Sequence, residues 1–168
     1  MAWFYPPFRR MMRVPSSPLH GELTSMRPAT DADAELLVSW HRDPEIARYW
    51  DNETFTHEEI RARLARPDVN PYIIEANGAP IGYLQAWFGN APGDAGLDMF
   101  LVPTARGHGF GPDAARALAT HLLQETGRNR ITVDPYLSNK RAIRAWQKAG
   151  FRPIKERRPT LTIPRLGC

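Results

Sequence analysis

A glycine-rich stretch in the second half of the chain constrains the fold more than any other feature. Residues 105–114 read A-R-G-H-G-F-G-P-D-A and lie between an apolar run ending at Val102 and a helical pattern beginning at Pro112. Glycine has no Cβ atom, so backbone N–H groups in such a stretch approach an anion closely, and the N-terminus of the following helix adds partial positive charge. The stretch therefore predicts a strand–loop–helix unit that binds phosphate.

The chain has the size and composition of one globular domain. It has 168 residues, 42% hydrophobic and 24% charged. No run approaches the roughly 18 apolar residues of a membrane span. The apolar start M-A-W-F-Y-P-P-F is short and precedes the arginines, so we expect no signal peptide and a cytoplasmic location. Cys168 is the single cysteine, which excludes an internal disulfide, and we expect no metal site.

Turn and capping signals divide the chain into alternating elements. Residues 1–20 contain Pro-Pro and Ser-Pro breaks and are interpreted as a mobile extension, which leaves 21–168 as a single domain. The expected strands are 22–28, the two arms of a hairpin over 71–88 that turns at Asn77-Gly78, 96–102, 130–134, 151–157 and a shortened T-L-T-I segment at 160–163. The expected helices are three short ones capped by Thr30, Asp43 and Thr56, then 112–125 and 139–149. This order indicates an α/β fold in which an antiparallel hairpin half meets a βαβ half.

Charge is unevenly divided along the chain. Residues 31–98 contain thirteen acidic residues and five arginines, whereas residues 99–168 contain thirteen Lys or Arg and four acidic residues. The net charge of +4 therefore hides an acidic half and a basic half, which suggests one cationic and one anionic ligand. The alternative is that both halves are solvated surfaces without a ligand.

Two phosphate-binding motifs fit the glycine stretch. The letters G-x-G-x-x-A over 109–114 match a dinucleotide fingerprint, and R-x-x-G-x-G over 106–111 matches the pyrophosphate loop of an acyl-CoA enzyme. A dinucleotide fold places its first glycine directly after the strand, but six residues separate Val102 from Gly109. Asp134 stands where a ribose-binding acid would belong, yet the chain has no room for the second half of such a fold.

A second motif follows the glycine stretch and favours the acyl-CoA enzyme. Residues 134–151 read D-P-Y-L-S-N-K-R-A-I-R-A-W-Q-K-A-G-F, and Asn139, Ala142 and Trp146 lie on one side of the expected helix. The two segments together resemble the conserved blocks of the GNAT acetyltransferase superfamily, and the resemblance covers nearly the whole chain except its N-terminal extension. It implies the GNAT acyl-CoA N-acyltransferase fold, an α/β (α+β) architecture with a mixed central sheet of about 6–7 strands and helices on both faces.

The resemblance also implies which residues bind the donor, acetyl-CoA. The loop 107–112 would hold the pyrophosphate of coenzyme A, the backbone of 100–102 would pair with the pantetheine arm, and Asn139 would lie near the thioester. The full set implied for the donor is Phe100, Leu101, Val102, Arg106, Gly107, His108, Gly109, Phe110, Gly111, Pro112, Asn139, Ala142 and Trp146.

Further segments narrow the resemblance to the aminoglycoside 6'-N-acetyltransferases. They are T-S-M-R-P-A-T-D-A-D, P-Y-I-I-E-A-N-G-A-P-I-G-Y-L-Q, and G-L-D-M-F-L taken with D-P-Y-L-S-N. In that subgroup two aspartates face the sugar amines, and they correspond to Asp98 and Asp134. The implied function is acetyl transfer from acetyl-CoA to the 6'-amine of an aminoglycoside, which confers resistance. The competing prediction keeps the fold but changes the acceptor to a lysine or siderophore precursor, a polyamine or a peptide amine.

Transfer to an amine requires a base. An ammonium group with a pKa near 10 costs about 4 kcal/mol to deprotonate at neutral pH, and a nearby carboxylate can take the proton. Asp98 is the first candidate, because its strand would pass beside the thioester, and Asp134 is the second, as a relay or an amine anchor. Side chains expected to contact the acceptor are Trp50, Asp51, Glu53, Gln85, Trp87 and Asp94; solvated acids and core packing are the competing interpretations.

One position departs from the family pattern. Many members have a tyrosine that protonates the leaving thiolate where this chain has Trp146, and an indole N–H group cannot act as that acid. Tyr136, a water molecule, or departure of the thiolate without an acid are the alternatives.

The expected partners follow from the same residues. We expect a small cationic amine as substrate, no membrane, and a monomer or homodimer, with the dimer favoured if the last strand is lost or swapped. A nucleic-acid binder would need aromatic and basic side chains interleaved on an exposed face, whereas Trp146 and Phe151 are better explained as core. Nucleic acid is therefore not expected as a partner.

Overall fold

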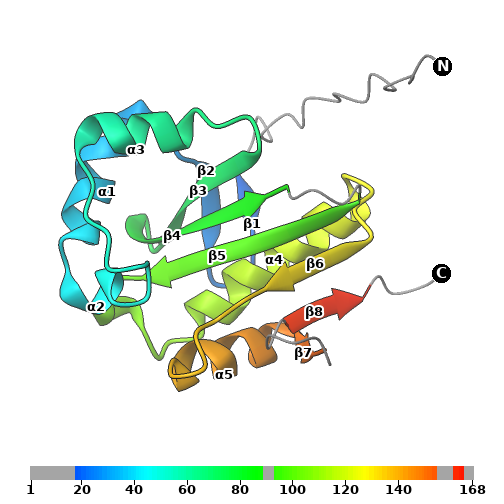
Figure 1. The fold of residues 1–168 in the computed structure, drawn as a ribbon. Helices are drawn as coiled ribbons and strands as arrows, with labels where there is room; N and C mark the ends of the chain where they lie inside the picture. Colours follow the sequence, from blue (N-terminus) through cyan, green and yellow to red (C-terminus); the bar gives the residue numbers. More distant parts are fainter. Residues whose placement is uncertain (1–17, 89–92, 155–160, 165–168) are drawn as a thin grey trace, which may run out of the picture.

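A computed structural model describes residues 18–88 and 93–154 and the backbone of 161–164, and these residues form one mixed sheet with helices on both faces (Figure 1). The strand order is β1-β2-β3-β4-β5-β6-β8-β7, in which the β5–β6 pair is parallel and the other neighbours are antiparallel. The strands are β1 (Leu19–His20), β2 (Ser25–Pro28), β3 (Val69–Ala76), β4 (Ala79–Trp87), β5 (Asp94–Leu101), β6 (Arg130–Val133), β7 (Arg152–Pro153) and β8 (Leu161–Pro164). The predicted fold class is confirmed, and the short strand β1, which was not predicted, brings the count from seven to eight.

The helices begin where the sequence places capping residues. Thr30 and Asp33 form a capping box around a 3-10 turn at Asp31–Asp33, Asp43 accepts a hydrogen bond from the Glu45 N–H, and Thr56 forms a second capping box. The helices are α1 (Ala34–His41), α2 (Pro44–Ala47), α3 (His57–Leu64), α4 (Phe110–Gln124) and α5 (Lys140–Ala149), with a second 3-10 turn at Pro103–Ala105. Helix α4 begins two residues before the predicted Pro112, because Gly109 adopts a left-handed conformation as its N-cap.

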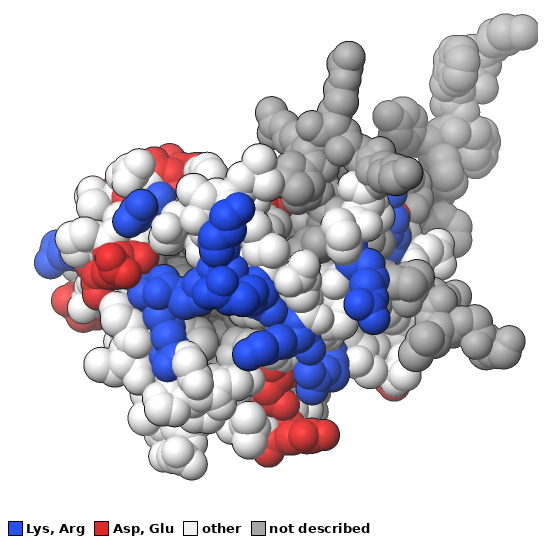
Figure 2. Space-filling model, turned by 90° about the horizontal axis from the view of Figure 1, so that it is seen from below, with Lys and Arg blue, Asp and Glu red and all other residues white. Residues whose placement is uncertain are grey.

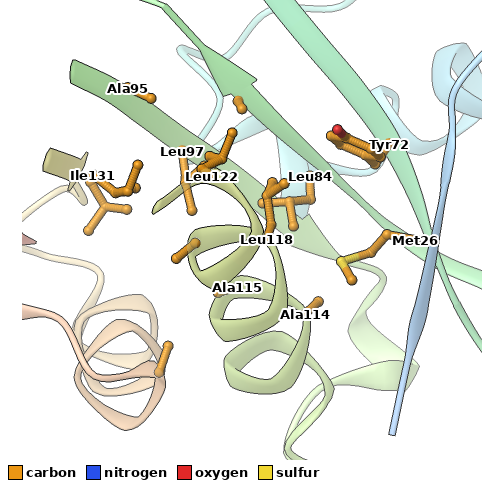
Figure 3. Close-up of a cluster of buried hydrophobic side chains, with 14 of the residues drawn as sticks. Met26, Tyr72, Leu84, Ala95, Leu97, Ala114, Ala115, Leu118, Leu122 and Ile131 are labelled. Carbon is orange, nitrogen blue, oxygen red and sulfur yellow. The ribbon is translucent and has the colours of Figure 1, made fainter. Parts of the chain in front are cut away.

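Two hydrophobic cores lie on opposite faces of the sheet. Helices α4 and α5 cover one face, and Figure 3 shows Leu118 and Leu122 of α4 packed against Leu84 and Leu97 of the sheet. The predicted apolar stripe of α4 is confirmed, since Ala114, Ala115, Leu118, Leu122 and Leu123 are all buried. The other face carries α1, α2 and α3 over Ile73, Tyr83 and Phe100, and alternation along β3 and β4 assigns neighbouring residues to opposite cores.

The sheet splits between β5 and β6. Their parallel pairing covers only Asp94–Gly96 opposite Arg130–Thr132, and β5 and β6 do not pair with each other beyond these residues. Asp98 and Asp134 both lie beyond the last pair, so one carboxylate stands on each side of the split. The split leaves one edge of β5 open over its second half, which is where a ligand can reach the backbone of the strand.

Three boundaries differ from the predictions. The sheet begins at Leu19, inside the segment interpreted as an extension, because Leu19 and His20 pair with Met26 and Ser25. The strand predicted over 151–157 is described only as Arg152–Pro153, and its last three residues lie outside the described part. The shortened last strand is present as β8, which pairs with β6 of the same chain. The extension over residues 1–17 and Cys168 also lie outside the described part. No helix among the described residues is long and apolar enough to cross a membrane.

Candidate active site

A groove runs along the open edge of β5 to the start of α4 and α5. Its lining comes from α2, β5, the glycine-rich loop and α5, and its volume is about 230 Å³. The residues that line it are Glu45, Ile46, Tyr49, Trp50, Met99, Phe100, Leu101, Arg106, Gly107, Gly109, Phe110, Gly111, Pro112, Asn139, Arg141, Ala142, Arg144, Ala145 and Lys148. We call it the donor groove, because it contains ten of the thirteen residues predicted to bind the donor.

The glycines of the loop have separate structural roles. Gly107 and Gly109 both have φ of 82°, a left-handed conformation that glycine adopts without strain. A Cβ atom on Gly107 would meet nothing within 4 Å, so its surroundings are open. A Cβ atom on Gly111 would lie 3.3 Å from Met99 Cε, so this glycine permits close packing of α4 on β5. The loop therefore presents backbone N–H groups at the N-terminus of a 15-residue helix, which is a favourable place for a phosphate group.

Arg106 fastens the loop to its surroundings. Its Nε donates to the Leu101 carbonyl at 3.1 Å, and Nη1 donates to Glu45 Oε2 at 3.3 Å. The guanidinium group therefore connects the end of β5 to α2 across the groove. These hydrogen bonds favour a role for Arg106 in holding the loop.

The open edge of β5 exposes the backbone of Met99 and Leu101. The Val102 N–H donates to the Ile81 carbonyl, so Val102 and, by alternation, Phe100 direct their polar backbone groups toward β4. The same alternation turns the N–H and C=O groups of Met99 and Leu101 to the groove. The prediction that residues 100–102 offer their backbone to pantetheine is therefore wrong for Phe100 and Val102. The residues whose backbone faces the groove lie one position earlier along the strand than these two. Val102 does not line the groove, whereas the Phe100 side chain does.

A larger cavity adjoins the donor groove at the split. It has a volume of about 980 Å³ and is lined by Tyr49, Trp50, Asp51, Glu53, Arg63, Gln85, Trp87, Leu97, Asp98, Met99, Asp134, Pro135, Tyr136, Leu137, Ser138, Asn139, Ala142 and Trp146. It shares Tyr49, Trp50, Met99, Asn139 and Ala142 with the donor groove. We call it the acceptor cavity, because four carboxylates and several aromatic side chains meet there beside the groove.

Among the carboxylates of the acceptor cavity, Asp98 has the surroundings that best suit a general base. Its Oδ2 accepts a hydrogen bond from Gln85 Nε2 at 2.9 Å, and Gln85 Oε1 accepts one from the Tyr83 hydroxyl at 2.9 Å. Burial raises the pKa of Asp98, the Gln85 hydrogen bond opposes this, and the charges of Asp51 and Asp134 raise the pKa further. A carboxylate with a raised pKa accepts a proton more readily, which suits a general base.

Tyr136 lines the acceptor cavity together with Asp98 and is hydrogen-bonded to Asp51. Its hydroxyl donates to Asp51 Oδ1, and its ring lies 6.3 Å from that of Tyr49. The hydrogen bond to Asp51 is the main cause of a raised pKa of Tyr136. Burial and the charges of Asp51 and Asp134 raise this pKa further. A phenol with a raised pKa is a weaker acid, so this contact disfavours Tyr136 as the group that protonates a thiolate.

The remaining predicted residues divide between the cavity and other places. Glu53 lines the acceptor cavity but accepts a hydrogen bond from Arg63 Nη2 at 2.9 Å, so part of its charge is paired. Asp94 lies outside both cavities: it opens β5 opposite Arg130, which donates to it at 2.9 Å. Asp94 therefore does not line the acceptor cavity as expected, because it lies in the part of β5 that is still paired with β6. His108 also lines neither cavity, and its ring lies 5.7 Å from that of Phe110.

The second motif places its residues at the junction of groove and cavity. Asn139 Oδ1 accepts a hydrogen bond from the Ala142 N–H at 3.0 Å and so caps α5. Trp146, about two turns after Asn139, is 5% exposed and packs edge to face against Phe151 at 5.3 Å. Trp146 lines the acceptor cavity rather than the donor groove, so its place in the donor set is not supported.

Several residues that line the donor groove or the acceptor cavity were not predicted from the sequence. Arg141, Arg144 and Lys148 line the donor groove from one side of α5, and Figure 2 shows the band of Lys and Arg side chains on this lower side of the molecule. Their three- and four-residue spacing was a readable signal, since such residues share a helix face. Tyr49 and Met99 lie at the junction of the two cavities and had no comparable signal, because an isolated tyrosine or methionine is usual in a core.

A mixed sheet that splits between two parallel strands, with a glycine-rich helix start beside the split, defines an acyl-CoA-dependent acyltransferase fold. The family described as an acetyltransferase (GNAT) domain matches residues 29–158. The chain therefore belongs to the GNAT acetyltransferase family and is an acyltransferase.

Relatives with known activities share most of the chain. It is 32% identical over 159 residues to an aminoglycoside N(6')-acetyltransferase type 1 of Klebsiella pneumoniae, across 83% of this chain and 77% of that protein. It is 27% identical over 143 residues to an N(6)-hydroxylysine O-acetyltransferase of Escherichia coli, across 74% of this chain and 44% of that protein. The solved structure of aminoglycoside acetyltransferase AAC(6')-Ib with coenzyme A and kanamycin superposes with a TM-score of 0.75 and 28% identity, across 84% of this chain and 95% of that one.

Proposed function

We propose that the protein is an acetyl-CoA-dependent N-acetyltransferase that acetylates the 6'-amine of aminoglycoside antibiotics and so confers resistance. The observation that carries the proposal is the placement of Asp98 and Asp134 on the two sides of the β5–β6 split, beside the donor groove. Because acetyl-CoA is an intracellular metabolite, we place the enzyme in the cytoplasm. The aminoglycoside N(6')-acetyltransferases among the relatives support the choice of acceptor.

The donor groove offers groups that suit the phosphates and the pantetheine arm of acetyl-CoA. The loop 107–112 offers N–H groups to a pyrophosphate, and basic side chains of α5 line the groove where they can meet the phosphates. The backbone of Met99 and the N–H group of Leu101 can pair with the amides of pantetheine, since the Leu101 carbonyl already accepts a hydrogen bond from Arg106. The apolar part of the groove at Ile46, Met99 and Phe110 suits the methylene groups of the same arm. Acetyl-CoA supplies an activated acetyl group with a thiolate as leaving group.

The acceptor cavity supplies charge and a base. An aminoglycoside carries several ammonium groups, and the cavity contains the carboxylates of Asp51, Asp98 and Asp134. We assign Asp98 as the general base: it takes one proton from the ammonium group, and the neutral nitrogen then forms its bond to the acetyl carbon as the carbon–sulfur bond breaks. The second proton of the nitrogen passes to Asp134 or to solvent. Asp134 anchors the amine or relays the proton. Trp50 and Trp87 offer flat apolar surfaces to sugar rings.

The leaving thiolate does not depend on Tyr136. The phenol of Tyr136 is held by Asp51, and a thiolate is stable enough to depart without a proton. Tyr49 lies at the junction of the two cavities, where its ring lies 6.3 Å from that of Tyr136 and 5.2 Å from the Arg48 guanidinium group. We therefore propose direct attack by the amine without an acyl-enzyme and without an obligatory general acid.

The proposal is tested by incubating the protein with acetyl-CoA and kanamycin and following release of free thiol. We expect thiol release that depends on both substrates, and a product whose added acetyl group lies on the 6'-nitrogen by NMR. Absence of thiol release with kanamycin, tobramycin and ribostamycin would refute the acceptor. A parallel panel of lysine, hydroxylysine and spermidine tests the second candidate, an acyltransferase for a lysine-type or polyamine acceptor, which the hydroxylysine O-acetyltransferase relative favours.

A further inference from the structure

Asp113 is a buried carboxylate near the donor groove that the proposed chemistry does not use. It lies in the first turn of α4 and is 5% exposed. Its Oδ1 accepts a hydrogen bond from the Glu22 N–H at 2.9 Å. Its Oδ2 accepts three more, from the Leu23 N–H at 3.0 Å, the Thr24 N–H at 3.0 Å and Thr24 Oγ1 at 2.7 Å. One side chain therefore holds the whole turn between β1 and β2.

The turn fits closely around this carboxylate. A Cβ atom on Gly21 would lie 2.1 Å from Asp113 Oδ2, so glycine is required there. Burial disfavours the charged form of Asp113, but the hydrogen bonds from Thr24 and from the N–H groups of the turn outweigh it and lower its pKa. The carboxylate is therefore ionised at neutral pH and its charge is spread over four donors.

The same turn reaches the glycine-rich loop. A Cβ atom on Gly109 would lie 3.5 Å from Leu23 Cδ1, so the Leu23 side chain rests against the residue that begins α4. Leu23 is 53% exposed, which is unusual for a leucine whose backbone is fixed by a buried acid. The turn thus supports the outer side of the loop at Gly109, while Arg106 holds the other end of the loop.

We propose that Asp113 is a positioning residue for the donor: it fastens the β1–β2 turn against the start of α4, so that the loop keeps the shape that binds pyrophosphate. The inference rests on the proposed use of acetyl-CoA. Two positive-φ glycines make the loop flexible by itself, and binding would otherwise have to order it. Ordering the loop in advance strengthens donor binding without contact between Asp113 and the donor.

Charge alone predicts the opposite effect, which makes the inference testable. A negative charge near an anion weakens binding, so on electrostatic grounds Asp113→Asn should bind coenzyme A more tightly. The positioning role predicts weaker binding, by about tenfold, because an amide cannot accept hydrogen bonds from all four donors. Gly21→Ala displaces the turn and leaves the charge in place, so it should weaken binding in the same direction.

The experiment measures the Kd for coenzyme A by calorimetry, together with hydrogen exchange of the 107–111 amides. We expect both variants to raise Kd and accelerate exchange, and kcat at saturating acetyl-CoA to remain within about twofold. Asp33→Asn is the matched control: Asp33 is also buried and bonded to Arg27 and Thr30, but it lies under α1 on the other face of the sheet. It should lower Tm and leave Kd unchanged.

An unchanged or lower Kd in folded Asp113→Asn would overturn the inference, whatever its Tm. If neither variant folds, Thr24→Val decides, because it removes one of the four hydrogen bonds and should still raise Kd measurably; an unchanged Kd would refute the positioning role. Failure of the unaltered protein to bind coenzyme A would overturn the proposed function as well. Binding by the unaltered protein with equal Kd in all variants would overturn this inference alone.

Discussion

Asp98→Asn tests the assignment of the general base. Asparagine has nearly the same shape, and its side-chain oxygen can still accept the hydrogen bond from Gln85, so the fold and the cavity should persist. The amide has no basic site, so the variant must use the small fraction of acceptor amine that is already neutral. The structure thus makes this substitution a test of proton transfer rather than of packing.

The expected loss follows from the pKa of the amine. With a pKa near 10, about one amine in a thousand is neutral at pH 7, so we expect kcat/KM to fall by about a hundredfold to a thousandfold. That loss corresponds to about 3 to 4 kcal/mol. It should shrink as the pH rises, because the neutral amine then becomes common without help from the enzyme.

The assay is thiol release with kanamycin between pH 5.5 and 9.5. For the unaltered protein, kcat/KM should be lost at low pH as Asp98 takes up a proton, and the raised pKa of Asp98 moves this loss above the range of an ordinary aspartate. For Asp98→Asn, kcat/KM should rise tenfold per pH unit and approach the unaltered protein near pH 9.5. A variant within threefold of the unaltered protein at pH 7, or one that does not recover at high pH, would refute the role of Asp98 as base.

Three other perturbations have defined outcomes. Gln85→Leu removes a hydrogen bond that favours the ionised base, so the low-pH midpoint of kcat/KM should move to higher pH; an unchanged midpoint contradicts this. Tyr136→Phe removes the hydrogen bond to Asp51 and should leave kcat within about threefold, whereas a hundredfold fall in kcat would identify Tyr136 as the acid. Acid should destabilise the fold through His41, because burial and then the charge of Arg63 lower its pKa from 6.5 to about 4. The unfolded chain binds more protons between these values, so stability falls by about 3 kcal/mol as pH falls through this window. His41→Phe should reduce that slope in urea unfolding at pH 7 and 4.5, and an equal slope would show that other groups cause it.

Local chemistry explains why much of the fold was predictable. Thr56, Asp43 and the Asn77-Gly78 turn act through hydrogen bonds and backbone angles within a few residues, so their effects can be read without knowing the fold. The stripe of α4 was predictable for the same reason, since helical spacing decides which side chains share a face. The donor loop combines both kinds of signal.

The incorrect predictions at the site concern Asp94 and the backbone that faces the groove. Both depend on how the strands pair, which residue spacing along the sequence does not reveal. Asp94 and Asp98 belong to one strand, and only the point where β6 leaves β5 decides which of them faces the acceptor cavity. The choice between Met99 and Phe100 for pantetheine depends on which strand edge is occupied by β4, because moving one residue along a strand reverses the direction of its polar backbone groups. Both facts require the pairing of strands that are distant in sequence.

The split in the sheet connects these observations to the chemistry. Parallel pairing ends at Gly96 and Thr132, so from there on β5 has a free edge, and Asp98 and Asp134 on the two sides of the split both line the acceptor cavity. A thioester bound along that edge and an amine held by Asp98 and Asp134 must then meet at the same point. The donor side of this point is positioned by groups far from it, with Arg106 and Asp113 at the two ends of the loop. Substitutions at those two residues should therefore change binding of the donor more than the rate of acetyl transfer, whereas substitution of Asp98 should do the reverse.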